Sequence, residues 1–232
     1  MQPGPVIALV RHADYKQPAG MPSAMLPYAL TEDGVRQAHE GAERIGQFAR
    51  ENRLDIARVI DSSHMLRAWQ TASIIGATLL GEDCVVSEFD ELAERSVGAV
   101  ANMTVDEIER VMADDPRYEP PPANWKADSH YRLPFQGAES LMDAGVRVAT
   151  HIERALRACI DGTGGLKIIV GHGASIRHAA LNLGLLSRDR VQALSMYHAR
   201  PVFVTKRDGK WEQVGGDWKV RKSASDGDEI RE

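Results

Sequence analysis

Two short apolar runs, each followed by a histidine, dominate the hydrophobic pattern of this chain. Residues 6–10 are all apolar and lead directly into Arg11 and His12. Residues 166–170 are apolar except for one lysine, and they lead into Gly171-His172-Gly173. Both runs are too short for a helix and rich in β-branched residues, so they predict buried strands. Because buried parallel strands end at the sheet edge where α/β proteins bind ligands, we expect both histidines and Arg11 at the mouth of an anion site.

Apolar residues at helical spacing predict four long helices. Thr31 is a suitable N-cap for the first, and Thr104 with Glu107 fits a capping box that opens a shorter fifth helix. A helix that starts near Ala174 or Ser175 would direct free N–H groups toward His172. The residues expected on the buried faces are Val35, Ala38, Ala42, Ile45 and Ala49; Leu66, Trp69, Ala72, Ile75 and Leu79; Leu141, Val148, Ile152 and Leu156; and Ile176, Ala179, Ala180 and Leu183.

Further strands are predicted at residues 57–60 and 85–86, and a hairpin at 202–205 and 210–214 that turns through Asp208-Gly209. Strands that alternate with helices predict an α/β fold. We expect a three-layer sandwich, in which helices flank a mixed and mostly parallel sheet and the terminal hairpin adds antiparallel strands at an edge.

The chain divides into one large domain and a short tail. Residues 1–222 are expected to form the domain, and the polar residues 223–232 a flexible tail. Residues 114–135 contain five prolines and no helical or strand pattern. Long irregular segments in compact domains are often functional, so we interpret this one as an inserted loop or cap over the site.

Composition narrows the classes of partner. The formal net charge of -5 argues against a nucleic-acid surface, although a local cluster such as Arg11 and Arg67 can still bind an anion. Two cysteines do not make a disulfide framework, which favours a reducing compartment. The sequence shows no signal segment and no run long enough to span a membrane, so a cytoplasmic location without membrane contact is the expectation. Nothing in the pattern predicts an oligomeric state.

Six ordered motifs resemble those of the histidine phosphatase superfamily, the phosphoglycerate-mutase-like group, and they span nearly the whole chain. Arg11-His12 after a buried strand resembles its Arg-His-Gly signature, with Ala13 in place of the glycine. The other motifs are Leu30-Thr31 with Gly34, Gln37 and Ala38; Ser62-Ser63 with Leu66-Arg67-Ala68 and Thr71-Ala72; Leu92, Glu94 and Gly98; Gly137 with Glu139-Ser140; and Gly171-His172-Gly173.

The resemblance implies phosphoryl transfer through a phosphohistidine on His12. His172 would stabilise the transferring group, and Glu94 would donate a proton to the leaving group, with Glu88, Asp90 and Glu91 as nearby rivals. Phosphate would be bound by Arg11, Arg67, His172 and Gly173. The chemistry of the residues agrees, because guanidinium groups match phosphate oxygens and a neutral imidazole is a nucleophile.

No cofactor is implied, and no metal-ligand spacing is found. The expected partner is a small phosphorylated metabolite or a phosphoprotein. Gln17, Trp125 and Tyr131 are expected to line the substrate. The other histidines, His39, His64, His151, His178 and His198, are expected on the surface or in the core, with His178 the one that faces the site if any does.

The reaction type is open between three alternatives. Phosphoglycerate mutases carry a Trp-Asn pair shortly after the Arg-His signature, and residues 14–20 here contain no such pair. A phosphatase needs only to admit water, so this departure favours a metal-independent phosphomonoesterase. A phosphoglycerate-type mutase is the second alternative, and a catalytically inactive phosphate-binding or scaffold protein is the third. The predicted site includes a proton donor, Glu94, which a binding or scaffold protein would not need. This argues against the third alternative.

Overall fold

A six-stranded mixed sheet forms the centre of the computed structural model, which describes residues 4–22, 25–161 and 165–221. The tail predicted at 223–232 lies outside these residues. The strands follow the order β3-β2-β4-β1-β6-β7, and the first four are mutually parallel. Strand β6 pairs antiparallel with β1, and β7 with β6. The strands are β1 (Val6–Arg11), β2 (Val59–Ser63), β3 (Val85–Phe89), β4 (Leu166–Gly171), β6 (Pro201–Arg207) and β7 (Lys210–Gly215).

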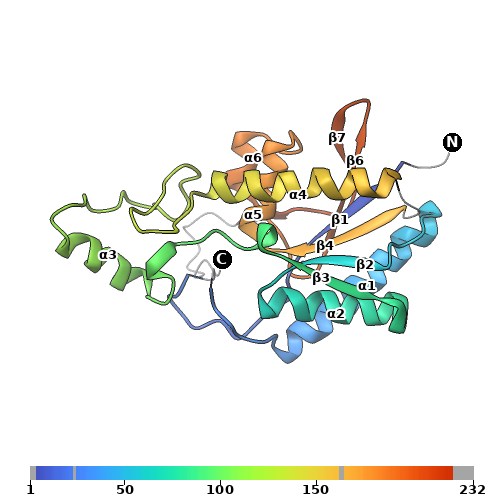
Figure 1. The fold of residues 1–232 in the computed structure, drawn as a ribbon, viewed down its shortest axis with the longest axis horizontal. Coiled ribbons are helices and arrows are strands. Elements are labelled where there is room, and N and C mark those ends of the chain that lie inside the picture. The colour runs from blue at the N-terminus through green and yellow to red at the C-terminus, as the bar shows by residue number, and fades with distance from the viewer. Residues whose placement is uncertain (1–3, 23–24, 162–164, 222–232) are drawn as a thin grey trace.

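Four long helices cover the two faces of this sheet (Figure 1). Helices α1 (Glu32–Asn52) and α2 (Leu66–Leu80) pack on one face, and α4 (Leu141–Asp161) and α5 (Gly173–Asn182) on the other. The described helices include none long and apolar enough to cross a bilayer. The shorter elements are α3 (Val105–Asp114), α6 (Arg188–Ala193), a two-stranded ladder of β5 (Leu194–Ser195) and β8 (Lys219–Val220), and 3-10 turns at Gly81–Asp83, Asp90–Leu92 and Gly98–Val100.

The side chains of β1 alternate between the two faces of the sheet, and both faces are buried. Ile7 and Leu9 point into the core beneath α4 and α5, whereas Ala8 and Val10 point into the core beneath α1 and α2. A strand buried on both faces must be apolar throughout, which is the pattern that residues 6–10 show. The predicted three-layer α/β sandwich is therefore confirmed.

The predicted caps and the hairpin turn are confirmed. The Thr31 hydroxyl accepts a hydrogen bond from the Gly34 N–H at 2.9 Å, and Thr104 with Glu107 forms the capping box. Asp208 and Gly209 both adopt positive φ angles, 49° and 78°, as a two-residue type I′ hairpin requires.

The predicted buried faces of α1 and α2 are partly wrong. Val35 is 40% exposed, and Trp69 is 41% exposed instead of lying in the core. Helix α2 begins at Leu66, which is also exposed, and turns Arg67, Ala68 and Thr71 inward. A hydrophobic pattern does not count a buried arginine or threonine, so the predicted face is wrong in the first turn of α2, whereas Ala72 and Ile75 are buried as predicted.

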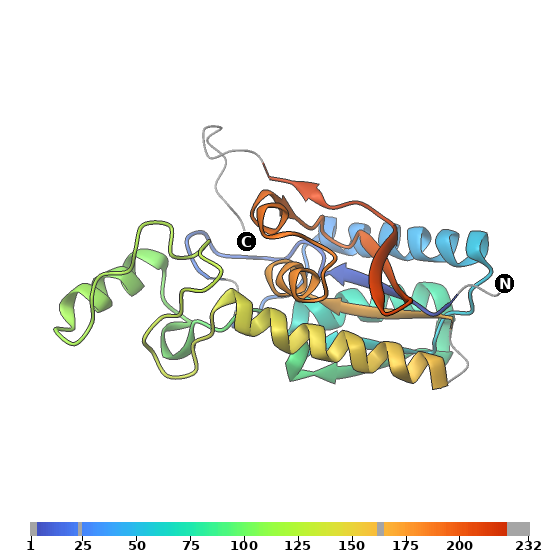
Figure 2. The ribbon, with the colours of Figure 1, turned by 90° about the horizontal axis from the view of Figure 1, so that it is seen from above.

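A separate extension projects from the sandwich beyond the carboxyl ends of the parallel strands. It contains α3 and the proline-rich residues 114–135, and Figures 1 and 2 show it to one side of the layered body. The extension has a small apolar core of its own, which includes Ile108, Met112, Trp125 and Leu133. A body with its own core can differ in shape without disturbing the sheet, and this separation suits a segment that determines specificity.

Close backbone packing of α1 predicts different effects for two glycine-to-alanine substitutions. In Gly41→Ala the new Cβ would overlap the carbonyl oxygen of Ala199. We expect this variant to lose about 1–3 kcal/mol of unfolding free energy, the usual cost of overpacking. The matched control is Gly46→Ala on the same helix, whose Cβ meets only the flexible ends of Leu79 and Arg50 at 3.0 and 3.2 Å. Urea denaturation should show Gly46→Ala at or above the wild-type midpoint, and equal midpoints for the two variants would contradict this packing argument.

Candidate active site

Strands β1 and β4 bring their carboxyl ends together. They pair in parallel with Arg11 opposite Gly171, so the next residues, His12 and His172, emerge side by side. The centroids of the two imidazole rings are 5.2 Å apart. Ser63 ends the neighbouring strand β2 at the same edge. Segments that are distant in the sequence thus meet where α/β folds place their ligands.

His12 is buried and held in one tautomer. Its Nδ1 lies 2.8 Å from the Ala13 carbonyl oxygen, which can only accept, so Nδ1 carries the proton and Nε2 carries the lone pair. The Thr71 hydroxyl accepts from the Ala13 N–H at 3.0 Å and fixes this turn. Burial, followed by repulsion from Arg67 and His172, lowers the pKa of His12 well below its usual value. At neutral pH the ring is therefore uncharged and nucleophilic at Nε2.

His172 lies in a buried chain of polar contacts with Arg67 and Ser63. Arg67 can only donate, so its contact to His172 Nδ1 at 3.1 Å leaves the proton on Nε2, which donates to the Ser63 hydroxyl at 2.9 Å. Burial and then Arg67 lower the pKa of His172 well below its usual value. Both ring nitrogens thus contact protein, and His172 would have to exchange one of these bonds to contact a phosphate.

Arg11 lies against the start of α5. Its Nη1 donates to the Met196 carbonyl at 3.1 Å, and its Nε is buried without a hydrogen-bond partner among the described residues. A Cβ at Gly173 would come within 3.1 Å of the Arg11 side chain, so glycine there permits this approach. Burial lowers the pKa of Arg11, and Glu94 opposes that effect.

Glu94 sits at the N-terminus of α5. Its Oε1 accepts from the Arg95 N–H at 2.9 Å and the Ser175 N–H at 3.2 Å, which leaves Oε2 for a further contact. The three rival carboxylates lie elsewhere. Asp90 pairs with His64 at 2.9 Å, Glu91 with Arg154 at 3.2 Å, and Glu88 is exposed.

Two cavities adjoin this cluster. The smaller, of about 10 Å³, is lined by Arg11, His12, Tyr15, Gln17, Glu94, Gly173 and Ala174. This is room for about one water molecule, so a phosphoryl group enters only when the surrounding side chains move. Neither Arg67 nor His172 lines it, and both are fully buried.

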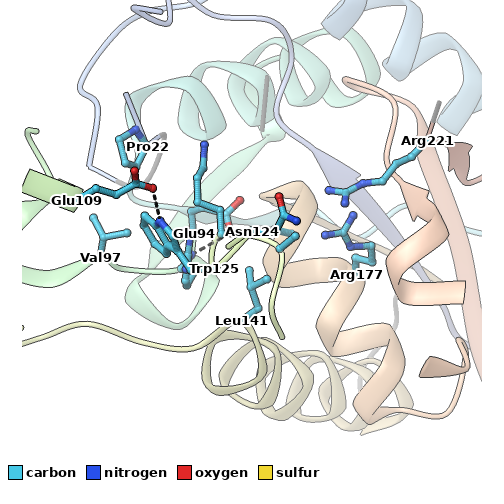
Figure 3. Close-up of a pocket in the computed structure, with 13 residues that line it drawn as sticks. Pro22, Glu94, Val97, Glu109, Asn124, Trp125, Leu141, Arg177 and Arg221 are labelled. Atoms are coloured by element: carbon cyan, nitrogen blue, oxygen red, sulfur yellow. Dashed lines mark hydrogen bonds between the residues drawn. The ribbon is translucent and has the colours of Figure 1, made fainter. Parts of the chain in front are cut away.

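The larger cavity, of about 290 Å³, shares Glu94 and Ala174 with the smaller one and extends beneath Trp125 (Figure 3). Among the residues expected to line the substrate, Gln17 lines the smaller cavity and Trp125 the larger one. Tyr131 lines neither; it is half-buried in the core of the extension, with its ring 6.2 Å from that of Trp125.

Three residues near the site were not predicted. Tyr15 contacts the His12 ring edge-on, with centroids 5.3 Å apart, and Arg67 lies 4.7 Å over the tyrosine ring. His198, expected on the surface or in the core, has its ring 5.7 Å from His12, and burial followed by repulsion from Arg11 lowers its pKa to about 3. Arg177, on α5, lines the larger cavity. A search for charged residues one helical turn after Gly-His-Gly would have found Arg177, whereas no strand-end signal marks His198.

Two further histidines, His178 and His151, have structural contacts. His178 is buried on α5, donates from Nδ1 to the Ala174 carbonyl at 2.8 Å and accepts from Ser129 at 3.1 Å. His151 contacts Asp61 at 2.9 Å between α4 and the sheet. Within the described ranges, no three His, Cys, Asp or Glu side chains gather as the ligands of a metal ion would.

Comparisons with known proteins identify the family. The sequence model of the histidine phosphatase superfamily (branch 1) matches residues 7–217. A 2,3-bisphosphoglycerate-dependent phosphoglycerate mutase from Parvibaculum lavamentivorans is 26% identical over 195 residues, which cover 84% of this chain and 86% of the mutase.

Solved structures share the fold at lower identity. The mycobacterial glucosyl-3-phosphoglycerate phosphatase in complex with VO3 superposes with a TM-score of 0.70 at 21% identity, over 94% of this chain and 100% of that one. Phosphoglycerate mutase from Bacillus anthracis superposes with a TM-score of 0.68 at 16% identity, over 90% and 92%. The same fold is therefore found in proteins named as phosphatases and as mutases.

The lowered histidine pKa values predict that stability falls as the pH falls. Burial lowers the pKa of His12 and His172 well below 6.5, that of His178 to about 4 and that of His198 to about 3. Between those values and about 6.5, the unfolded chain binds more protons than the folded chain. We therefore expect full stability above pH 6.5, and below it a loss of up to about 1.4 kcal/mol per pH unit for each histidine that stays neutral.

Urea denaturation between pH 7 and 5 would measure this slope. His178→Gln removes one titrating ring outside the cluster around His12. It should reduce the slope of unfolding free energy against pH by up to about 1.4 kcal/mol per pH unit, which corresponds to one proton. A wild-type stability that does not change over this range would show that the buried imidazoles titrate normally.

Proposed function

The chain belongs to branch 1 of the histidine phosphatase superfamily, and we propose that it is a metal-independent phosphomonoesterase that acts through a phosphohistidine on His12. The observation that carries the proposal is the state of His12. Its Nδ1 proton is tied to the Ala13 carbonyl, its Nε2 lone pair is available, and Arg11 and Glu94 line the same small cavity. A neutral nucleophile, a cation and a carboxyl group are what phosphoryl transfer from an ester needs.

In the first step His12 Nε2 attacks phosphorus, the ester P–O bond breaks, and Glu94 gives its proton to the leaving oxygen. In the second step Glu94 takes a proton from water, the water oxygen bonds to phosphorus, and the P–N bond breaks to release inorganic phosphate. Arg11, whose buried Nε has no partner among the described residues, would bind an equatorial oxygen. Arg67 and Arg11 together would offset the negative charge of the transferring phosphoryl group, a role that a metal ion fills in other phosphatases.

Substrate entry would rearrange the Arg67–His172 contact. A phosphoryl oxygen can take the place of His172 Nδ1 as acceptor for Arg67, and it can receive the His172 Nε2 proton in place of Ser63. The incoming dianion would raise the depressed pKa of His172 and strengthen both bonds. Because the site is narrow and lies beside a half-enclosed cavity, a small phosphorylated metabolite suits it better than a phosphoprotein.

A mutase reaction is the second candidate, because a phosphoglycerate mutase is 26% identical over 84% of the chain. In that case the phosphohistidine would return its phosphoryl group to a phosphoglycerate instead of to water. Supplying 3-phosphoglycerate with a trace of 2,3-bisphosphoglycerate separates the two reactions. Release of inorganic phosphate supports the phosphatase, whereas 2-phosphoglycerate formed without free phosphate would replace it with the mutase.

Substitution of the nucleophile tests the proposal directly. We expect His12→Ala to lower kcat for an aryl phosphate by at least about three orders of magnitude, the scale typical of a lost nucleophile. Wild-type activity should persist in excess chelator, and a rapid alkaline quench should trap a labelled phosphoenzyme whose phosphoramidate bond is stable in base and is lost in acid. His39→Asn, an exposed position on α1, is the matched control and should keep full activity. Activity that survives in His12→Ala would exclude His12 as the nucleophile.

The proton-donor role of Glu94 predicts a dependence on the leaving group. In single-turnover measurements, Glu94→Gln should slow cleavage of an alkyl phosphate by about 100-fold, the lower end for general acid catalysis. The same variant should slow cleavage of 2,4-dinitrophenyl phosphate by less than about tenfold, because that leaving group needs no proton. An equal loss for both esters would assign Glu94 to positioning α5 instead.

A further inference from the structure

We infer that the ion pair of Arg147 and Glu139 positions Glu94 for proton transfer to the leaving group. The inference rests on the proposed function and deepens it, because it gives a role in the reaction to two residues that line neither of the two cavities at the site. Arg147 lies on α4, and Glu139 lies two residues before that helix begins. Both are positioning residues, which act through the backbone of the segment that carries Glu94.

The segment that carries Glu94 is irregular. It connects the 3-10 turn at Asp90–Leu92 to the one at Gly98–Val100, and residues 93–97 belong to no helix and to no strand of the sheet. Leu92 packs in the core beneath α4 and α5 and holds the start of the segment. The carbonyl groups at the end of a helical turn have no partner within that turn, so donors from elsewhere must bind them.

Arg147 supplies these donors. Its Nη1 donates to the carbonyl oxygens of Glu91 at 2.8 Å and Ala93 at 3.1 Å. Longer contacts of 3.4 Å join its guanidinium group to the carbonyl oxygens of Asp90 and Glu94. The contacted carbonyls lie on both sides of the Glu94 Cα atom, so the position of one guanidinium group determines where the Glu94 side chain begins.

Glu139 fixes the orientation of Arg147 and also binds the segment. Its carboxylate accepts from Arg147 Nε at 2.9 Å and Nη2 at 2.7 Å, a bidentate arrangement that sets the plane of the guanidinium group. The same carboxylate accepts from the Ser96 N–H at 3.1 Å, and the Glu139 N–H donates to the Ser96 carbonyl at 2.9 Å. The side chains of Arg147 and Glu139 are only 22% and 25% exposed, so solvent screens this pair less than a surface pair.

Two of the sequence motifs meet at this ion pair. The motif that contains Glu94 ends at Gly98, which has a φ angle of 71° and lies so close to the Gln136 carbonyl oxygen that a Cβ would overlap it. The Ala99 N–H donates to the same carbonyl at 3.1 Å. The motif that contains Glu139 begins directly after Gln136, so backbone contacts and the ion pair join the two motifs into one unit around the proposed proton donor.

Loss of the ion pair would displace Glu94 without removing its carboxyl group. Proton transfer requires a carboxyl oxygen within hydrogen-bond reach of the leaving oxygen, and a displacement of about 1 Å can cost about 100-fold in rate. His12 and Arg11 are positioned by β1 instead, so attack on phosphorus should continue. Only esters whose leaving group needs a proton should therefore react more slowly.

Leaving-group dependence tests the inference. In single-turnover measurements, Arg147→Met should slow cleavage of an alkyl phosphate by about 10- to 100-fold, and cleavage of 2,4-dinitrophenyl phosphate by less than about threefold. Arg147→Lys keeps the positive charge and loses the planar fork, so it should recover part of the loss. In a Glu94→Gln background, Arg147→Met should slow the alkyl ester no further, because the carboxyl group that it positions is gone.

A second arginine of α4 provides the matched control. Arg154 contacts the same 3-10 turn through the Glu91 carboxylate, at 3.2 Å, rather than through its backbone. Arg154→Met should therefore change the rate with neither ester. Melting temperatures will show whether each variant is folded in the assay. If Arg147→Met is not folded, Arg147→Lys and Glu139→Gln decide the matter, since each weakens the bidentate pair and should show the same dependence on the leaving group.

The outcomes separate the inference from the proposed function. Equal losses on both esters in folded Arg147 variants, or a further loss on the alkyl ester in the Glu94→Gln background, would overturn the positioning role and leave Glu94 as the proton donor. If Glu94→Gln itself shows no dependence on the leaving group, both the proton-donor role and the inference are overturned. A dependence that Arg147→Met shares with Glu94→Gln, that Arg154→Met lacks and that the double variant does not increase would establish the positioning role.

Discussion

Burial of positive charge beside His12 is the constraint from which the properties of the site follow. Two guanidinium groups, those of Arg11 and Arg67, lie at the carboxyl edge of the sheet with little exposure to solvent. Their contacts include carbonyl oxygens, an imidazole and the Tyr15 ring, and Glu94 is a carboxylate that acts on both. Taking positive charge out of water is costly, so this arrangement lowers the stability of the fold. An oxyanion is the ligand that would recover it.

The same burial sets the protonation of His12, the proposed nucleophile. Cations near His12 and His172, together with the loss of solvent, hold both rings neutral at a pH where exposed histidines begin to gain protons. A charged imidazole could not attack phosphorus, so charge that weakens the resting protein also keeps His12 reactive. The narrow cavity adds to this effect because it has room for only about one water molecule beside His12.

Most of the framework could be predicted from the sequence, because it depends on local patterns. The strands before His12 and His172, the Thr31 cap and the Asp208-Gly209 turn each follow from a few adjacent residues. The inner face of the first turn of α2 could not be predicted, since a hydrophobic pattern does not register a buried arginine such as Arg67. His198 and Arg221 are positioned by single backbone pairings to Arg11 and Ala193, and such long-range bonds leave no periodic signal.

Helix α5 contributes residues to both cavities. Its N-terminus receives the Glu94 carboxylate and places Gly173 against Arg11, while Arg177 projects from its next turn into the larger cavity. The opposite wall is supplied by the extension, which has its own core and can change without altering the sheet. A division of this kind allows one catalytic centre to serve different phosphate esters, because the chemistry depends on the strand ends and the choice of substrate on the segments that surround them.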